Sequence, residues 1–522
     1  MTYINIEVGM GAEKIGRRSL LLGAGALALA AACSTKSEAG TQADVVSTTH
    51  GPVRGVRRET GFAFLGIPFA APPVGALRFA APVAPTPWRE TLDCVKYGPT
   101  AQRKQLAEVT AIPEPTIPGD GILNLNVFTP ETSRDAKLPV LVWIHGGGFV
   151  AGCSASPWYD GAAFNRDGVV VVSVGYRLGI EGFLHLEDAP DNRAVLDWIA
   201  ALQWVRDNIA AFGGDPAKVT VAGQSAGGGA LWALMGTPAA KGLFRAGISE
   251  SGAMSQPNDR ATAMAMSALF TKRTGLPATA AAMKDLGRDQ IQALEDKLRA
   301  AGPDSSPALL LGLAPWADGT LIPQSSTDMV KNSAAVDVPL LLGFTTQEFN
   351  GAALSGDTPP VTDATLPMAL AAMGFDAAGF QAAYPGQSAA ELSGQAQSDA
   401  LLRAPAYRVA EARAGRDQPT WLYEFAWRSQ APEYRGMAFH CLDVPFAFDL
   451  LKADGVTKIA GPNPPQSLAD AIHKSWVSFI SNGDPGAAWP RYTLDRREAM
   501  IWADVPSVQS DPYAAQRPVW LR

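Results

Sequence analysis

Cysteine and histidine are scarce in this chain, and their scarcity limits its chemistry. The 522 residues contain 4 cysteines and 5 histidines. Cys94, Cys153 and Cys441 lie far apart with no metal-ligand spacing, so the sequence predicts neither a metal site nor a cofactor. The sequence allows one disulfide among these three cysteines but selects no pair, and we expect most of them to be buried free thiols.

Strong charge and low-complexity segments are also missing. The net charge is -7, and 18% of the residues are charged. No basic patch is present, so we expect no nucleic-acid partner. Neither a Gly/Ser or Pro tract nor an internal repeat divides the chain. With 47% hydrophobic residues, the composition predicts a globular protein with a large core.

The first 32 residues resemble an export signal. Lys14, Arg17 and Arg18 precede an apolar run over 20–29 that is too short to span a bilayer comfortably. The Arg17-Arg18 pair resembles a bacterial twin-arginine signal. We therefore set residues 1–32 apart from the fold.

Cys33 follows three alanines and resembles a lipoprotein processing site, at which it would be lipidated. Plain cleavage after Ala32 fits equally well. In either case we expect residues 33–44 to form a polar tether and residues 45–522 to form the folded domain. The protein would then be exported in a bacterium, either periplasmic or anchored by a lipid.

Short β-branched runs alternate with helical patterns after residue 45, which predicts an α/β fold with a mainly parallel sheet covered by helices. Two less regular stretches, about Ser255–Ser306 and Gly351–Ala404, look like helical insertions over a cleft. The expected strands are Leu138–Ile144, Val169–Val174, Val219–Ala222, Ala246–Ser249, Pro339–Gly343 and Leu422–Ala426, and the clearest helices are Ala194–Phe212 and Gly228–Met235.

Ser225 is the strongest candidate for a nucleophile. It lies in Gly223-Gln224-Ser225-Ala226-Gly227, between an expected strand and an expected helix. Glycines two residues before and after a serine allow a tight turn that exposes its hydroxyl, as in ester and amide hydrolases. In a Gly-rich chain the motif alone is weak, but its strand–turn–helix context strengthens it.

A glycine loop, His145-Gly146-Gly147-Gly148, follows the strand Leu138–Ile144. Glycines let backbone N–H groups converge on a ligand, as an oxyanion hole requires. The two motifs together favour acyl-transfer chemistry over a flexible loop without function.

The general base must be a histidine, and elimination favours His440. His50 lies near the mature N-terminus, and His145 belongs to the glycine loop. His185 follows a strand–turn segment, and His473 is expected at the surface. Glu348 follows the strand Pro339–Gly343 and so lies where α/β sheets collect functional groups. The order Ser…Glu…His is that of α/β-hydrolases.

The chain resembles the type B carboxylesterases, the cholinesterase/carboxylesterase family, from about Val45 to its C-terminus, and its bacterial p-nitrobenzyl-esterase-like members most. The segments that match this family are Phe64–Ala70, Leu123–Val127, Trp143–Phe149, Ala201–Val205, Phe212–Pro216, Gly343–Glu348 and His440–Phe448.

This resemblance implies an α/β-hydrolase fold and a Ser225, Glu348 and His440 triad. It also implies an oxyanion hole from the N–H groups of Gly147, Gly148 and Ala226. Ser251 resembles a position that supports the acid. By analogy, structural ion pairs should join Arg78 to Asp120 and Arg177 to Asp197.

Two departures from the family bear on the substrate. Gln224 replaces the usual glutamate before the nucleophile, which removes a negative charge. Asp120-Gly121-Ile122 replaces the family's Glu-Asp-Cys, so the disulfide-closed loop that carries the choline site has no counterpart. We therefore expect a monomeric serine hydrolase of uncharged or weakly polar carboxylic esters.

Two alternatives stay open at this point. The same triad could hydrolyse an amide, thioester or lactone, because the machinery is shared. A non-catalytic binding module with this fold is less consistent, because the chain keeps all three triad candidates.

Overall fold

The computed structural model describes residues 45–101, 112–252, 257–300, 312–332, 337–351, 361–434 and 436–520. By their internal contacts, Ala43–Arg522 form one compact unit. The predicted leader, residues 1–32, and the tether with Cys33, residues 33–44, lie outside the described residues. So do parts of both predicted insertions.

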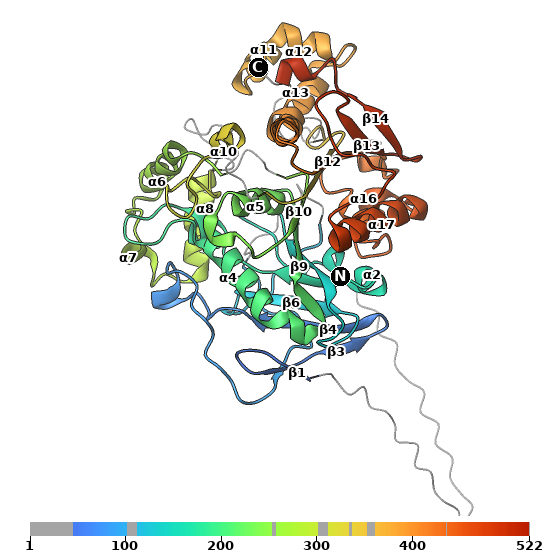
Figure 1. Ribbon diagram of the computed structural model, residues 1–522. Helices are drawn as coiled ribbons and strands as arrows, with labels where there is room; N and C mark the ends of the chain where they lie inside the picture. The colour runs from blue at the N-terminus through green and yellow to red at the C-terminus, as the bar shows by residue number, and fades with distance from the viewer. Residues whose placement is uncertain are drawn as a thin grey trace, which may run out of the picture. The chain divides into compact units, whose positions relative to one another are not determined.

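A large sheet lies at the centre of the described chain (Figure 1). In the order given in the next sentence, the seven strands from β13 to β8 run parallel to one another. The strands at both edges pair antiparallel. In order across the sheet, the strands are β14 (Ser507–Ser510), β13 (Glu498–Trp502), β12 (Thr420–Phe425), β11 (Leu340–Thr345), β10 (Ala246–Glu250), β9 (Gly214–Gln224), β7 (Leu138–Ile144), β8 (Val170–Val174), β6 (Asn124–Thr129), β4 (Gly61–Pro68) and β3 (Val56–Arg58).

A second, small sheet and the helices surround this centre. The small sheet consists of β1 (Val45–Ser47), β2 (Pro52–Arg54) and β5 (Leu92–Asp93). The helices are α2 (Ala162–Arg166), α3 (Gly179–Phe183), α4 (Arg193–Asn208), α5 (Ala226–Met235), α6 (Arg260–Thr274), α7 (Ala280–Met283), α8 (Arg288–Arg299), α10 (Ser326–Asn332), α11 (Leu366–Ala372), α12 (Ala377–Ala383), α13 (Ala389–Ser398), α14 (Ala404–Ala414), α15 (Val444–Ala447), α16 (Val456–Ala460), α17 (Gln466–Asn482) and α18 (Arg517–Trp520).

Helices cover both faces of the sheet because the central strands are apolar on both sides. Along β7, Val140, Val142 and Ile144 belong to one buried cluster, which also holds residues of α4 and α5. Leu141 and Trp143 point into a second cluster with residues of α17. This period-2 alternation inside a continuous apolar run is typical of parallel strands. The predicted fold class is confirmed.

Both predicted insertions contain helices in their described parts. Residues 257–300 form α6, α7 and α8, and residues 361–404 include α11, α12 and α13. In Figure 1 the latter three helices gather near the C-terminus, where α12 packs against α18.

Cys94, Cys153 and Cys441 are all buried and free, so the expectation of buried thiols is confirmed and the disulfide left open is not formed. None of the helices in the described ranges is long and apolar enough to cross a bilayer.

Candidate active site

Ser225 lies in a strained turn between β9 and α5. Its φ of 56° and ψ of -120° are rare for a residue with a side chain, as in a nucleophile turn. The Ser225 N–H donates to the Glu250 carbonyl at 2.9 Å, which ties the turn to β10. A Cβ on Gly227 would lie 1.9 Å from the Ile144 carbonyl oxygen, so only glycine lets β7 pass this close.

The glycine loop lies against this turn. A Cβ on Gly146 would come within 2.8 Å of the Gln224 carbonyl oxygen and 3.1 Å of the Ser225 Cβ. Gly147 and Gly148 have φ values of 103° and 60°, which favour glycine. Within the described residues, the N–H groups of Gly147, Gly148 and Ala226 donate to no protein acceptor. Three donors therefore remain free beside the candidate nucleophile.

His145 holds the glycine loop in place. Its Nδ1 lies 2.8 Å from the Gly146 carbonyl oxygen, and its ring stacks on Tyr176 at 4.3 Å between centroids. The Tyr176 hydroxyl donates to the His145 carbonyl at 2.9 Å. Burial lowers the pKa of His145 to about 4, so this imidazole is neutral at neutral pH. Its role is structural.

Glu348 and His440 come together from loops that follow β11 and β12. Glu348 Oε2 lies 2.6 Å from His440 Nδ1, with both side chains buried. Glu348 Oε1 accepts the Thr345 N–H at 2.8 Å, and its carbonyl accepts the His440 N–H at 3.0 Å. These bonds fix the carboxylate and leave His440 Nε2 pointing away from it, which is the orientation that a general base requires.

His440 Nε2 faces the nucleophile turn, but its partner there is Gln224. The Gln224 Nε2 lies 3.2 Å away, and this amide is fully buried. Ser225 Oγ forms no hydrogen bond with His440 among the described residues. Because Nδ1 is held by a carboxylate, Nε2 is the acceptor in the neutral ring and Gln224 donates to it. The sequence did not predict this contact, although it marked Gln224 as a departure from the glutamate that is usual in the family.

Two further acids lie behind the Glu348–His440 pair. Glu250 ends β10, and Asp443 follows His440 by three residues; both are buried. Burial raises the pKa of both carboxyls, and for Glu250 the neighbouring Asp443 adds to it. Tyr423 donates to Asp443 Oδ2 at 3.1 Å. A raised pKa favours the neutral form of a carboxyl, so these two groups add less negative charge behind the pair than two ionised acids would.

Ser251, which the resemblance pairs with the acid, contacts the sheet through its backbone. Its N–H donates to the Gly343 carbonyl at 2.9 Å, and its φ is 45°. The Ser251 Oγ is buried and has no hydrogen-bond partner within the described residues. Support of Glu348 by this hydroxyl stays a prediction.

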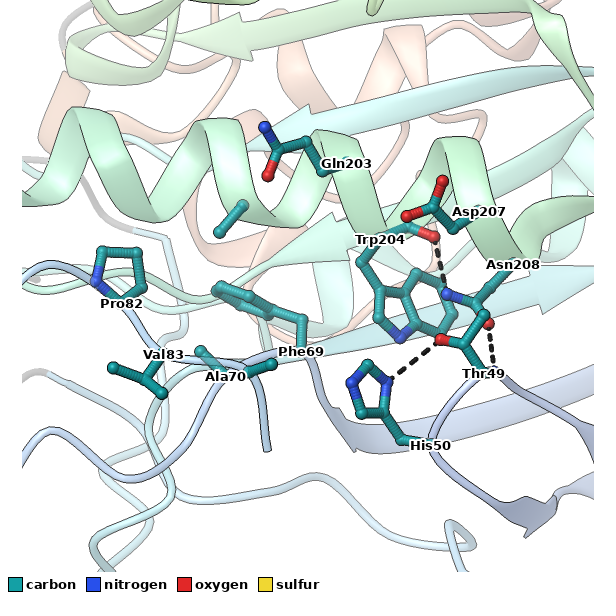
Figure 2. A pocket seen from close by; sticks show the side chains of 12 residues that line it. Thr49, His50, Phe69, Ala70, Pro82, Val83, Gln203, Trp204, Asp207 and Asn208 are labelled. Atoms are coloured by element: carbon teal, nitrogen blue, oxygen red, sulfur yellow. Dashed lines mark hydrogen bonds between the residues drawn. The ribbon is translucent and has the colours of Figure 1, made fainter. Parts of the chain in front are cut away.

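The remaining histidines lie in other environments. His50 lines a surface hollow of about 180 Å³ with Phe69, Trp204 and Asn208, apart from the triad candidates (Figure 2). His185 Nδ1 pairs with Asp191 at 2.7 Å.

The surface role expected for His473 is wrong. This residue is buried, because its Nδ1 binds the Ala447 carbonyl at 2.8 Å and its ring packs on Phe164. A histidine beside a lysine on an amphipathic helix can still face the core, and here it joins α17 to α15.

One of the two predicted ion pairs is confirmed. Arg177 binds both carboxylate oxygens of the buried Asp197, with distances of 2.9 and 2.7 Å. The Arg78–Asp120 pair is wrong: Arg78 pairs with Glu181 at 3.1 Å, and Asp120 with Arg288 at 3.2 Å. Asp120 is exposed, so a buried arginine finds a better partner in the buried Glu181.

In the described ranges, no group of three His, Cys, Asp or Glu side chains could hold a metal ion. The site consists instead of a serine turn, free N–H groups, and a carboxylate–imidazole pair at the carboxyl edge of a parallel sheet. This combination defines a serine hydrolase with the α/β-hydrolase fold. A model described as the carboxylesterase family matches residues 42–366 and 381–520. The chain belongs to the carboxylesterase family, and it is a serine carboxylic ester hydrolase.

Individual relatives agree with this assignment. A para-nitrobenzyl esterase of Bacillus subtilis is 35% identical over 91% of this chain and 97% of its own length. A medium-chain fatty acyl-CoA hydrolase precursor of Anas platyrhynchos is 33% identical over 94% of the chain and 93% of its own. A solved PNB esterase superposes with a TM-score of 0.81 at 34% identity, covering 92% of this chain and 99% of that one.

Proposed function

We propose that Ser225, Glu348 and His440 form the catalytic triad of this ester hydrolase, with Gly147, Gly148 and Ala226 as the oxyanion hole. The observation that carries the proposal is the 2.6 Å contact between Glu348 Oε2 and His440 Nδ1, with the other ring nitrogen facing the Ser225 turn.

In this mechanism Ser225 Oγ attacks the ester carbonyl while His440 Nε2 takes its proton. The free N–H groups bind the oxyanion, and His440 returns the proton to the leaving alcohol. Water then repeats the cycle on the acyl-enzyme. Glu348 holds Nδ1–H and stabilises the imidazolium.

Before the first step, His440 Nε2 must exchange its contact with Gln224 for one with Ser225 Oγ. Hydrogen bonds of this kind are often long or misaligned without substrate and tighten when it binds. The Gln224 amide, 3.2 Å from Nε2, therefore acts as the resting partner of the base.

The substrates we infer are uncharged or weakly polar carboxylic esters. Gln224 is neutral where the family usually has a glutamate, and the raised pKa values of Glu250 and Asp443 favour their neutral forms behind the site. A cation therefore finds little to bind.

Thioesters are a second candidate class. They use the same attack, and one relative is named a fatty acyl-CoA hydrolase. A panel of nitrophenyl esters of increasing acyl length, run beside matched thioesters and amides, compares these classes directly.

The decisive experiment targets the nucleophile. A serine-reactive organophosphonate should label Ser225 alone. Ser225→Ala should keep its fold, checked by circular dichroism, yet lose at least about three decades of kcat. Labelling of another serine, or retained turnover in the variant, would refute the proposed triad.

We also infer export through residues 1–32, with the catalytic domain starting at about residue 45 and acting as a monomer. Replacing Arg17 and Arg18 by lysine should leave the precursor in the cytoplasm of a bacterial host. If the protein incorporates a labelled fatty acid and Cys33→Ser abolishes this incorporation, the protein has a lipid anchor at Cys33. If no label is incorporated, the leader is simply cleaved. Light scattering of the purified protein tests the monomer.

A further inference from the structure

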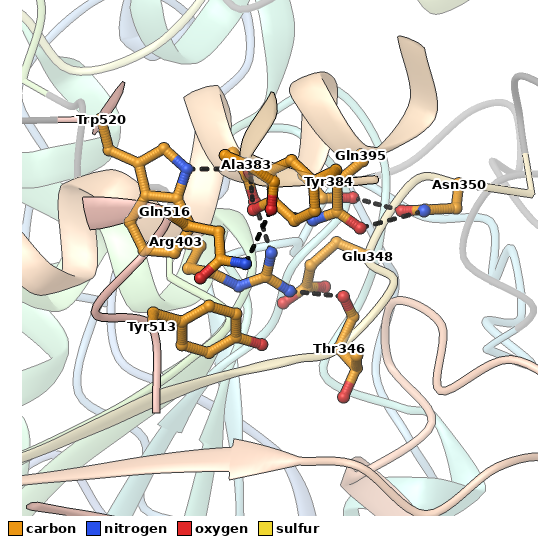
Figure 3. A network of polar contacts seen from close by, with 12 residues as sticks. Thr346, Glu348, Asn350, Ala383, Tyr384, Gln395, Arg403, Tyr513, Gln516 and Trp520 are labelled. Carbon is orange, nitrogen blue, oxygen red and sulfur yellow. Dashed lines mark hydrogen bonds and ion pairs between the residues drawn. The ribbon is translucent and has the colours of Figure 1, made fainter. Parts of the chain in front are cut away.

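The loop that carries Glu348 is held by side chains from a distant part of the chain. This acid loop, defined as residues 346–350, connects β11 to the active site. The Arg403 guanidinium donates to the Thr346 carbonyl, two residues before Glu348. The Phe349 N–H, one residue after Glu348, donates to Ser398 Oγ at 3.0 Å. The loop is therefore held on both sides of the carboxylate. Figure 3 shows the first of these contacts, between Arg403 and Thr346.

A third contact strengthens this grip. Ser398 Oγ donates to Asn350 Oδ1 at 2.8 Å, and the Asn350 amide nitrogen donates to Gln395 at 3.3 Å. Phe349, between these anchors, places its ring 4.7 Å from the His440 ring. The contacts thus reach both members of the carboxylate–imidazole pair.

Arg403 is itself held by several contacts. It forms an ion pair with Asp399, and both side chains are almost completely buried. Asp399 also accepts hydrogen bonds from Tyr384 at 2.5 Å, Gln395 at 2.8 Å and Trp520 at 2.9 Å. The guanidinium lies 4.7 Å from the Tyr513 ring centroid. Figure 3 shows these side chains converging on Arg403 from separate segments.

The local helix geometry explains how Ser398 and Arg403 reach the same loop. Residues Asp399–Arg403 form a π-helical turn between α13 and α14. In an α-helix, residues five apart point about 140° away from each other, whereas the wider π-turn brings them onto one face. Such turns are rare and are found frequently at functional sites.

A buried ion pair is an inefficient way to gain stability, because desolvation of the charges offsets their attraction. Here the pair holds a backbone carbonyl beside the proposed triad acid. We propose that Arg403 and Ser398 are positioning residues that set the orientation of Glu348 toward His440. This inference rests on the proposed function, because it acts through the same triad.

Arg403→Lys and Ser398→Ala test the proposal. Each should lower kcat about 10- to 100-fold with little change in KM, because small displacements of catalytic groups have effects of this size. A weaker Glu348–His440 bond also stabilises the imidazolium less. The acid limb of the kcat/KM profile should therefore move to lower pH, a shift that a loss of stability alone does not produce.

Arg413→Lys is the matched control. Arg413 is also buried, lies on the adjoining α14, and donates to the Val338 carbonyl at 2.6 Å. It therefore grips the chain before β11, whereas Arg403 grips it after β11. Its variant should lower the melting temperature but keep kcat and the pH profile of the parent.

Titration of active sites with the organophosphonate corrects each kcat for the fraction of folded enzyme. Unchanged kcat and pH profile in Ser398→Ala would overturn the inference even if Arg403→Lys fails to fold. An equal shift in Arg413→Lys would overturn it as well. Ser225→Ala separates the two claims: if that variant keeps its activity, the proposed triad fails, whatever the positioning variants do.

Discussion

Gln224 joins the turn of the proposed nucleophile to the proposed general base, His440, through one hydrogen bond. Its amide Nε2 lies 3.2 Å from His440 Nε2, and its Oε1 is buried without a partner within the described chain. A carboxylate in the same place would attract the imidazolium rather than donate to the neutral ring. In the proposed mechanism, the charge of this side chain would affect both the ease of proton transfer and the preference for charged substrates.

Gln224→Glu should move the acid limb of the kcat/KM profile to higher pH, because the new charge stabilises protonated His440. It should also raise kcat/KM for a cationic ester relative to a neutral ester of equal size. Kinetics with a choline ester and its uncharged carbon analogue measure both effects. Gln224→Met, which is neutral and similar in size, serves as the control, and an unchanged substrate ratio in Gln224→Glu would contradict the argument.

Gly227 is the residue at which the turn tolerates least change. Gly227→Ala would place a methyl group 1.9 Å from the Ile144 carbonyl oxygen, so β7 and the turn must separate. We expect kcat to fall about 100-fold, as for other small displacements of catalytic groups. Gly121→Ala, where nothing lies within 4 Å of the added methyl, should behave as the parent in the same assay. Parent-like kcat in Gly227→Ala would show that the turn can adapt.

At the scale of single residues, the sequence offered candidate residues more readily than their partners. Motif, order and elimination led to Ser225, Glu348 and His440 as triad candidates, and the structure places Glu348 Oε2 2.6 Å from His440 Nδ1. The partner of Arg78 was predicted wrongly because Glu181 and Asp120 carry the same charge, and the buried one of the two is its partner. Burial of a single acid depends on packing that no local pattern encodes.

At the scale of elements, the site lies at the carboxyl ends of the parallel strands, where the loops after these strands hold its residues. The loop after β8 contains Arg177, whose guanidinium binds Asp197 on α4 and also donates to the Arg78, Ala80 and Arg193 carbonyls. This one side chain thus fixes the position of α4 relative to the sheet edge.

Arg177→Met should reduce the free energy of unfolding by about 3–5 kcal/mol, because it leaves Asp197 buried and unpaired. Adding Asp197→Leu should recover at least about 1 kcal/mol, since it removes that charge. Urea denaturation of the two variants and the parent gives both values. A double variant that is less stable than Arg177→Met would mean that the pair stabilises the fold beyond its desolvation cost.

Strongly apolar elements were predicted most closely. The predicted strand Leu138–Ile144 has the bounds of β7, because its flanks end the apolar run abruptly. β9 begins at Gly214, five residues before the predicted Val219, since Gly214 pairs with Leu138 across a register shift. The π-helical turn Asp399–Arg403 was not predictable, because it depends on tertiary partners such as Thr346 and Trp520.

Across the whole molecule, several carboxyl groups are buried with little opposing charge. Burial raises the pKa of Glu114 to about 8 and that of Glu295 to about 7. A group with a raised pKa holds its proton longer in the folded chain than in the unfolded chain. Such groups make the protein less stable as the pH rises, in contrast to acids whose pKa is lowered on folding.

Glu295 allows a test of this fall in stability with rising pH. It lies on α8, accepts the Ile180 N–H at 3.3 Å, and has Arg299 4.0 Å away; Glu181 and Asp296 also raise its pKa. Between its ordinary value of 4.5 and about 7, the unfolded chain loses this proton while the folded chain keeps it. The contribution of Glu295 to the free energy of unfolding therefore falls by about 3 kcal/mol in total as the pH rises through this range.

Glu295→Gln keeps the acceptor for Ile180 and removes the titration. Its free energy of unfolding, measured by urea denaturation from pH 4 to pH 8, should rise relative to the parent as the pH increases, by about 3 kcal/mol at pH 8. Glu391→Gln is the control, for which we expect the opposite dependence of stability on pH. Hydrogen bonds from the Ser388 backbone and side chain lower the pKa of the exposed Glu391, so it stabilises the folded chain above its unfolded value and loses that effect as the pH falls. Parallel stability curves for Glu295→Gln and the parent would mean that Glu295 is charged when folded.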